Sequence, residues 1–220
     1  MMKVRRPFNV VRPIADQMVQ HFAAQGLVCE VGGSLRRQCK TVGDLDIVVR
    51  CADLQSIALP DWVMFHRQGE QVAQGGMLMA DGSELNVDVW AATEAQWGAF
   101  LWYITGSKVL NIVMRRKAQE RGLKLSQFGL FRDDVQVDDG TERGVAAALG
   151  MDWIEPVNRN WGVVEEPLRS VTVPSSSGEG FYTVNETERG WVCSCPHHTF
   201  RRVECKHIRS VKQADLERCG

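Results

Sequence analysis

GDLDIVV, residues 43–49, is the segment most informative about the fold, because it alternates acidic and apolar side chains. Neighbouring side chains of a strand point to opposite faces, so Asp44 and Asp46 share one face while the apolar residues enter the core. ELNVDVW, residues 84–90, repeats the alternation and places Asp88 on its polar face. If the two strands are neighbours, three carboxylates converge, and such hard oxygen ligands suit Mg²⁺ or Mn²⁺ held together with phosphates. Two such ions stabilise the attacking and leaving oxygens of an in-line phosphoryl displacement.

The phosphate-binding half of this chemistry is predicted in GGSLRR, residues 32–37, which follows an apolar stretch typical of a strand. Glycines let the backbone approach a phosphate closely, and the hydroxyl of Ser34 is a further donor. One guanidinium of Arg36 and Arg37 would grip a triphosphate in a bidentate way. Each motif alone has a plainer interpretation, because a Gly-Gly-Ser segment is most often only a turn and Asp-x-Asp is common on strands. The ordered set of glycine segment, Asp-x-Asp and later strand aspartate is far more specific to nucleotidyl transfer.

The composition is that of an ordinary globular chain. Of its 220 residues, 44% are hydrophobic and 24% are charged, which suits one or two domains with a packed core. The net charge of −1 argues against general polyanion binding, but residues 1–43 carry seven Lys and Arg against two acidic residues, and residues 97–124 six against one. Such patches form either a track for phosphates or a solvated face. The chain has neither an apolar stretch of membrane-spanning length nor the apolar core of a signal peptide, so we expect a protein that is not secreted and binds no membrane.

Two short motifs near the C-terminus, Cys-x-Cys and Cys-x-His, predict a metal site. The chain has seven cysteines and no secretory signal, which favours thiols or metal ligands over disulfides. Three thiolates and one imidazole in this order predict one closed, tetrahedral, structural Zn²⁺ site. The four ligands would be Cys193, Cys195, Cys205 and His207. His197 and His198 are alternative ligands, although the loop between the two motifs is the more natural place for them.

Hydrophobic periodicity and turn residues give a coarse division of the chain into elements. We expect a helix over 10–25, strands at 28–31, 45–50, 62–66, 77–80 and 84–90, a helix between Ser107 and Gly122, then a short strand pair and a helix over 142–149. The segment PSSSGEG, residues 174–180, has the composition of a flexible linker.

Further segments make the chain resemble the DNA polymerase X family over about residues 5–160. YITGSK, residues 103–108, is similar to the family's Tyr-Phe-Thr-Gly-Ser hinge, which generic nucleotidyltransferases lack, and AAALGMDWIEP, residues 146–156, resembles the end of the family's thumb. The Cys/His pattern follows the aromatic segments FYTV, residues 181–184, and WV, residues 191–192, and together they resemble the SWIM zinc finger. The resemblance implies an α+β fold with a mixed-sheet palm and flanking helices, followed by a small α+β thumb. The expected parts are the palm at 1–95, the thumb at 96–165, a linker at 166–180 and the zinc finger at 181–220.

The resemblance also implies roles for individual residues. Asp44 and Asp46 would bridge two Mg²⁺ or Mn²⁺ ions, while Asp88 would bind the catalytic ion and accept the proton of the primer 3′-hydroxyl. The expected contacts to the incoming nucleotide are Gly33, Ser34, Arg37 and Arg5 at the phosphates, Tyr103, Thr105 and Gly106 at the sugar, and Asn111 at the base. The expected DNA contacts are Lys108, Arg115 and Arg116.

The chain also departs from the family pattern. Asn86 stands where relatives usually have an Arg, Trp90 replaces a residue that is often basic, and Ile104 replaces the hinge Phe. In relatives these side chains couple nucleotide binding to closure, so we expect modest fidelity. Because the palm begins close to residue 1, the resemblance is to a reduced polymerase without the lyase and fingers domains.

Taken together, these features predict a monomeric, template-directed DNA polymerase that fills short gaps during repair. Its partners would be deoxynucleoside triphosphates and double-stranded or gapped DNA, with the zinc finger binding DNA or a protein. A cytoplasmic or nucleoid-associated location fits, and so does a viral or phage origin. One alternative is a template-independent enzyme, like a terminal transferase, on the same palm. The other is a DNA-binding adaptor with an inactive palm.

Overall fold

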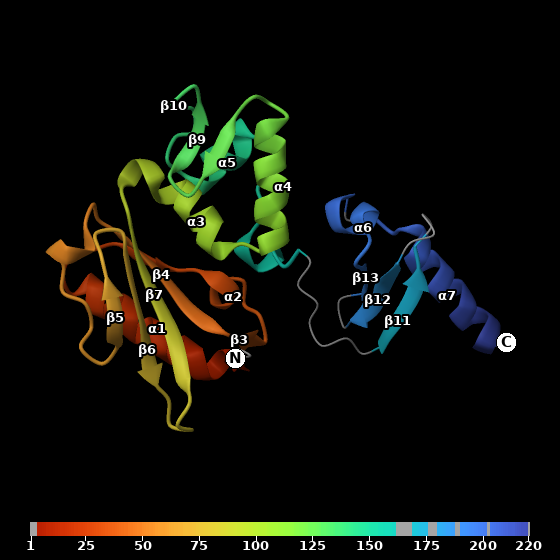
Figure 1. Ribbon diagram of the computed structural model, residues 1–220, viewed down its shortest axis with the longest axis horizontal. Helices are drawn as coiled ribbons and strands as arrows, with labels where there is room; N and C mark the ends of the chain where they lie inside the picture. Colours follow the sequence, from red (N-terminus) through yellow and green to blue (C-terminus); the bar gives the residue numbers. More distant parts are fainter. Residues whose placement is uncertain (1–3, 162–168, 176–179, 188–189, 202, 220) are drawn as a thin grey trace. The chain divides into compact units, whose positions relative to one another are not determined.

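Five strands form a mixed sheet in the order β2-β4-β7-β6-β5, which carries the acidic residues singled out by the sequence (Figure 1). The strands are β2 (Cys29–Val31), β4 (Asp44–Arg50), β5 (Met64–Gln68), β6 (Val72–Leu78) and β7 (Glu84–Ala92). β4 and β7 run parallel, whereas the other three neighbouring pairs are antiparallel. The two alternating stretches are therefore adjacent strands, which is the condition on which the carboxylate cluster depends.

The structure, a computed structural model, describes residues 4–161, 169–175, 180–187, 190–201 and 203–219. The chain divides into two compact units, residues 1–160 and residues 161–220, and the five-stranded sheet belongs to the first. Within the described ranges no helix is both long and apolar enough to cross a membrane.

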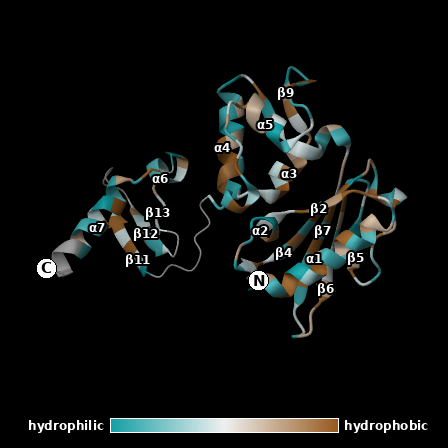
Figure 2. Ribbon diagram, turned by 180° about the vertical axis from the view of Figure 1, so that it is seen from behind, coloured by the Kyte–Doolittle hydropathy of each residue, from teal (hydrophilic) through white to brown (hydrophobic). Residues whose placement is uncertain are grey.

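Helix α1 (Phe8–Ala23) covers one face of the sheet. Its buried residues Val11, Ala15, Met18 and Phe22 recur at helical spacing, and they pack against the apolar side chains of β4 and β7. Figure 2 shows hydrophobic stretches, in brown, on the ribbons of α1 and of the sheet. The predicted helix over 10–25 is thus confirmed, with its start and its end each two residues earlier. Because the core lies between α1 and the sheet, the acidic residues of β4 and β7 are left on the other face.

Two short elements lie next to this core. The strands β1 (Arg6–Pro7) and β3 (Thr41–Val42) pair in antiparallel fashion. The glycine segment forms the short helix α2 (Gly33–Arg36) and not merely a turn, because Leu35 is buried in the same core and anchors the helical turn.

The second half of the first unit is a small α+β layer. Its elements are η2 (Glu94–Gln96), α3 (Trp97–Thr105), α4 (Lys108–Gln119), β8 (Lys124–Ser126), β9 (Gly129–Arg132), β10 (Val135–Gln136), α5 (Glu142–Ala148) and η3 (Pro156–Asn158). The Ser107 hydroxyl accepts a hydrogen bond from the Leu110 amide at 3.4 Å and so caps α4, the helix predicted between Ser107 and Gly122. Helix α3 was not expected, because it is almost uniformly apolar and lacks the periodicity of a surface helix.

The second unit contains a three-stranded antiparallel sheet and two helices. These are β11 (Arg169–Pro174), β12 (Phe181–Thr187), β13 (Gly190–Cys193), α6 (Pro196–Arg201) and α7 (Lys206–Cys219). Residues 169–174, expected within the linker, instead form β11, which pairs with β12 along its whole length. Val171 and Val173 alternate with polar residues and pack on the small core of the unit, which explains the strand. Residues 166–168 and 176–179 of the expected linker lie outside the described residues, and the Ser175 amide donates to the Gly180 carbonyl at 3.0 Å.

Candidate functional site

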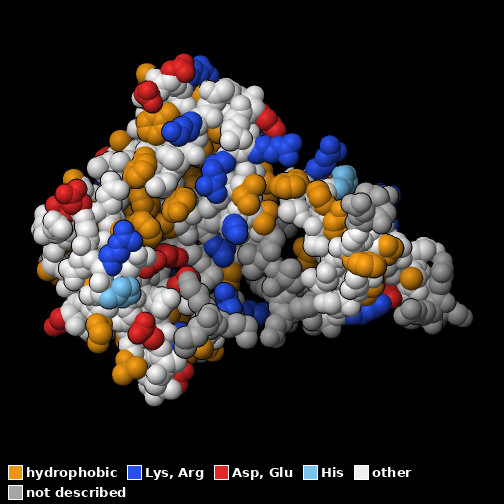
Figure 3. Space-filling view, viewed as in Figure 1, with side chains coloured by type: hydrophobic (Ala, Val, Ile, Leu, Met, Phe, Trp, Pro, Cys, Tyr) orange, Lys and Arg blue, Asp and Glu red, His pale blue; other side chains and the backbone are white. Residues whose placement is uncertain are grey.

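A cleft of about 480 Å³ in the first unit gathers most of the predicted site residues. It lies between the acidic face of the sheet, α2 and the junction of α3 with α4. Figure 3 shows Lys and Arg side chains on this face of the unit, close to acidic ones. Its lining residues are Arg5, Gly33, Ser34, Arg37, Asp44, Asp46, Trp90, Tyr103, Ile104, Thr105, Gly106, Lys108, Asn111 and Arg115. Asp88 and Arg116 are the two predicted residues of this unit that are not among them.

The three aspartates occupy one face of two neighbouring parallel strands. Asp44 and Asp46 are half-buried on β4, between fully buried apolar residues, and Asp88 has the same setting on β7. In the register of the two strands, Asp46 lies directly beside Asp88. Adjacent strands are about 4.8 Å apart, so these carboxylates project from neighbouring points of the sheet. The side-chain amide of Gln74 on β6 donates a hydrogen bond to Asp88 Oδ1 at 3.3 Å.

The start of α2 faces this carboxylate row and leaves no room for a side chain. Gly33 has φ +59°, and a Cβ placed there would lie 2.5 Å from Asp46 Oδ2. A Cβ on Gly32 would meet the Ile104 side chain at 2.6 Å. The buried Ser34 hydroxyl has no hydrogen-bond partner among the described residues. Three carboxylates, a bare backbone and an unused hydroxyl on one wall form a donor set that fits divalent ions held together with phosphates.

Two arginines in the cleft wall are held by neutral groups. Arg37 Nε donates to Asn160 Oδ1 at 2.9 Å, and a second Arg37 nitrogen donates to the Thr105 carbonyl. Burial lowers the pKa of Arg37 below the usual value for arginine. Arg5 Nε donates to the Thr41 hydroxyl at 2.9 Å. Both arginines line the same cleft as Asp44 and Asp46.

The hinge lies where α3 ends and α4 begins. Gly106 has φ +69°, a left-handed conformation that favours glycine. Asn111 Nδ2 donates to the Tyr103 carbonyl at 2.8 Å, so this amide is engaged within the hinge. Arg116 is not among the residues that line the cleft, and it pairs with Glu120 at 3.2 Å on the exposed side of α4.

A buried ion network beside the hinge was not foreseen. Glu142 accepts hydrogen bonds from Arg36 at 2.6 and 2.8 Å and from Arg159 at 2.6 Å. Arg159 is fully buried, with its guanidinium 3.5 Å above the Trp102 ring, while Arg36 also donates to the Thr105 hydroxyl at 2.9 Å. Burial pushes the pKa of Glu142 upward, but the two guanidiniums outweigh it and hold that pKa below its usual value. Arg36 is therefore committed to this network, which leaves Arg37 as the arginine of the pair in the cleft.

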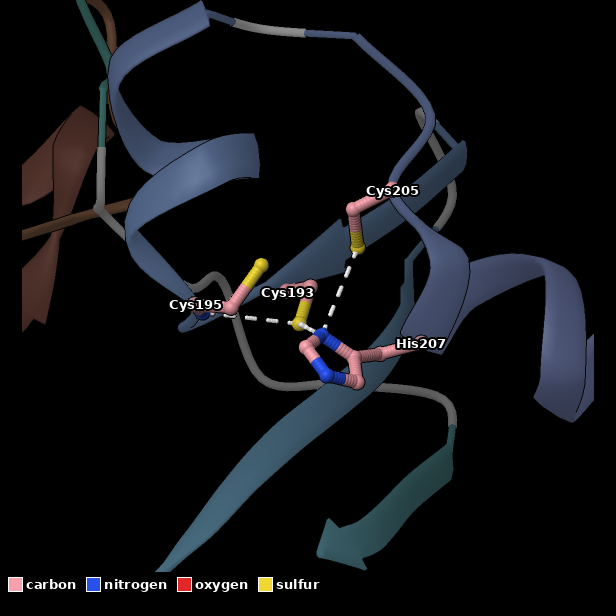
Figure 4. A group of neighbouring side chains, drawn as sticks. All are labelled: Cys193, Cys195, Cys205 and His207. Atoms are coloured by element: carbon pink, nitrogen blue, oxygen red, sulfur yellow. Dashed lines mark hydrogen bonds between the residues drawn. The ribbon is translucent and has the colours of Figure 1, made fainter. Parts of the chain in front are cut away.

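The Cys/His set of the second unit comes together as the sequence predicts. Its four ligand atoms lie within 4.8 Å of one another, and all four side chains are buried and directed toward a common centre (Figure 4). His207 Nδ1 lies 3.8 Å from Cys193 Sγ and 3.9 Å from Cys205 Sγ. Tetrahedral zinc bonds of about 2.3 Å to sulfur and 2.0 Å to nitrogen separate these atoms by about 3.5 Å, so the set fits Zn²⁺. Burial raises the pKa of the Cys193 thiol to about 12.

The two alternative histidines are placed differently. His198 Nδ1 lies 2.9 Å from the Val203 carbonyl, and His197 lines a neighbouring groove. Across the described part of the chain, the set of Cys193, Cys195, Cys205 and His207 is the one group of at least three Cys, His or acidic ligands whose atoms lie this close together. The carboxylates of Asp44, Asp46 and Asp88 share one face of the sheet but are not drawn together to the same extent.

Comparison with known proteins agrees with the geometry of the first unit. Residues 100–160 match the DNA polymerase beta thumb family. The chain is 30% identical over 169 residues to the DNA polymerase/3′-5′ exonuclease PolX of Bacillus subtilis, which covers 72% of this chain and 29% of that protein. It is 27% identical over 180 residues to DNA polymerase lambda of Rattus norvegicus (66% of this chain, 31% of that protein) and 29% identical over 200 residues to that of Arabidopsis thaliana (72% and 37%).

These similarities support the resemblance to the DNA polymerase X family, with a thumb of the beta type. The chain spans about a third of the length of the relatives it matches.

Proposed function

We propose that the chain is a template-directed DNA polymerase that adds deoxynucleotides to a primer 3′-hydroxyl and fills short gaps in repair. The observation that carries this proposal is the parallel register of Asp46 and Asp88, directly beside the bare backbone of Gly33. This arrangement places the carboxylates that would bind metal ions next to the backbone that would bind phosphates. The named activities of the polymerase relatives agree with it.

The carboxylates have separate tasks in this proposal. Two divalent ions bound by Asp44, Asp46 and Asp88 would neutralise the triphosphate and lower the pKa of the primer hydroxyl. Asp88 accepts the hydroxyl proton on a carboxylate oxygen. The 3′-oxygen then bonds to the α-phosphorus, and the bond from this phosphorus to the pyrophosphate breaks.

The cleft walls bind and orient the two substrates. The Gly33 backbone, the Ser34 hydroxyl and the Arg37 guanidinium hold the β- and γ-phosphates, with Arg5 beside them. Tyr103 and the Thr105-Gly106 segment lie against the sugar, where a bulky ring excludes a ribonucleotide 2′-hydroxyl. Asn111 reaches the base once it leaves the Tyr103 carbonyl. Lys108 and Arg115 on α4, with Arg116 further along, bind the DNA backbone.

The second unit is proposed to hold one structural Zn²⁺ and to bind DNA. Arg201, Lys206 and Arg209 are exposed around the Cys/His set, and a groove of about 420 Å³ beside it is lined by Lys206, Arg209 and Tyr182. Lys212 pairs with Glu204 at 2.5 Å, and Arg202 lies outside the described residues. If the unit grips DNA, R209E weakens binding and lowers the salt dependence of affinity by about one counterion. Unchanged DNA affinity after deletion of residues 175–220 would exclude this role.

Primer extension on a one-nucleotide-gapped duplex with Mg²⁺ or Mn²⁺ tests the polymerase proposal. The wild-type chain is expected to extend the primer, and D88A is expected to lose at least a hundredfold in rate. Addition that ignores the template would favour the terminal-transferase alternative. If no nucleotide is added to any DNA, the alternative of a DNA-binding adaptor with an inactive palm is favoured. We also propose that the chain is a monomer, which sedimentation of the DNA-free chain tests. The origin of the chain from a phage or virus stays a prediction.

A further inference from the structure

Four polar residues form a row across four neighbouring strands of the five-stranded sheet. In the strand registers Arg67 on β5 lies beside Gln74 on β6, Gln74 lies beside Asp88 on β7, and Asp88 lies beside Asp46 on β4. Residues paired in this way project from the same face of a sheet. The row therefore runs from the exposed edge strand β5 to the carboxylates of the cleft.

Hydrogen bonds connect the row from its exposed end inward. Arg67 donates to Gln74 Oε1 at 3.2 Å, and Gln74 Nε2 donates to Asp88 Oδ1 at 3.3 Å. A guanidinium only donates and an ionised carboxylate only accepts, so just one orientation of the Gln74 amide satisfies both neighbours. Arg67 thus determines which end of the amide faces Asp88.

We propose that Gln74, oriented by Arg67, is a positioning residue that fixes the rotation of the Asp88 side chain. The arginine charge reaches the carboxylate through a polarised amide and not by a direct ion pair. The side chain of Asp88 is therefore oriented by a neutral partner, the Gln74 amide. The relay itself is a property of the fold, whereas its effect on catalysis rests on the proposed polymerase function.

Side-chain amide NMR of the ¹⁵N-labelled full chain tests the relay without any reaction. The Gln74 amide signal is assigned by its disappearance in Q74M. We expect its exchange with water to be at least fivefold slower than that of the exposed Gln68 amide, whose residue neighbours Arg67 on β5. R67M and D88A should each remove this protection and shift the Gln74 signal, while the Gln68 signal stays in place. The relay would be overturned if the Gln74 amide exchanged as fast as the Gln68 amide and its signal stayed unchanged in R67M and D88A.

Kinetics then test the role of the relay in catalysis. Q74M keeps the size of the side chain but cannot donate, and we expect kcat to fall about tenfold with the KM for the nucleotide unchanged within twofold. In R67M, kcat should fall about threefold. The kcat of the double variant should equal that of Q74M, because both substitutions break the same chain of hydrogen bonds. Q68M is the matched control and should behave as wild type. Additive losses, or a normal kcat in Q74M, would refute positioning. An inactive wild type with a protected Gln74 amide would refute the polymerase proposal alone.

Discussion

Arg36 donates two hydrogen bonds, at 2.8 and 2.6 Å, to the two carboxylate oxygens of Glu142, and so ties α2 to α5. The same carboxylate accepts a hydrogen bond from the fully buried Arg159. The helix that opens with Gly33 is therefore fixed to the thumb side of the cleft by an ion network. Because Arg36 also donates to the Thr105 hydroxyl, this network connects the proposed phosphate site on α2 with the hinge.

Removal of the shared carboxylate should destabilise the first unit strongly. E142A leaves two cations without their counter-ion, one of them fully buried, and we expect the free energy of unfolding to fall by about 3–5 kcal/mol. Urea unfolding followed by tryptophan fluorescence measures it. The matched control is E120A, which removes a carboxylate from an exposed pair with Arg116 and should cost less than about 1 kcal/mol. Equal losses in the two variants would contradict the network's role.

The same carboxylate predicts a dependence of stability on pH. The pKa of Glu142 is lower in the folded chain than its ordinary value of 4.5, so the unfolded chain binds the proton more tightly. Its stabilisation is complete above pH 4.5 and is lost as pH falls through the folded-state value. The difference in unfolding free energy between wild type and E142Q should therefore shrink as the pH drops below 4.5. A difference that stays constant from pH 7 to pH 3 would show that the ion pair does not form.

Gly33 offers a test that separates the site from backbone strain. In G33A the new Cβ would meet Asp46 Oδ2 at 2.5 Å, so the carboxylate must move, and we expect primer extension to fall at least a hundredfold. Both G33A and G82A place alanine at a positive φ, which costs about 1–2 kcal/mol. Gly82 has open space around it, so G82A should lose similar stability and keep its activity. Full activity in G33A would contradict a catalytic role for the Asp46 carboxylate in its present position.

The strands that carry the aspartates and most of the cleft were predictable because local patterns determine them. The strand expected at 77–80 was misplaced, since β6 covers Val72–Leu78 and contains two adjacent glycines that hide its alternation. Alternation placed Asp44, Asp46 and Asp88 on one face, and ligand spacing identified the Cys/His set. Gln74 and Glu142 were missed because their partners lie far away in sequence and are set by strand register and helix packing. The only local signal was the position of Glu142 in the first turn of a capped helix.

Metal removal should unfold the second unit selectively. We expect one Zn²⁺ per chain by elemental analysis, and its removal by a chelator should abolish the thermal transition of residues 161–220 while leaving that of the first unit. C205S should reproduce this loss, whereas C39S, a buried thiol of the first unit, should retain the metal. An unchanged transition in the metal-free chain would contradict a structural zinc.

Dependence on the template base distinguishes a template-directed polymerase from every alternative. Single-nucleotide insertion is measured on four one-nucleotide gaps that differ only in the template base, with each of the four deoxynucleoside triphosphates in turn. We expect the complementary nucleotide to be inserted fastest on every template, and D46N to abolish insertion on all of them. Insertion rates that do not change with the template base, or that persist in D46N, would contradict it.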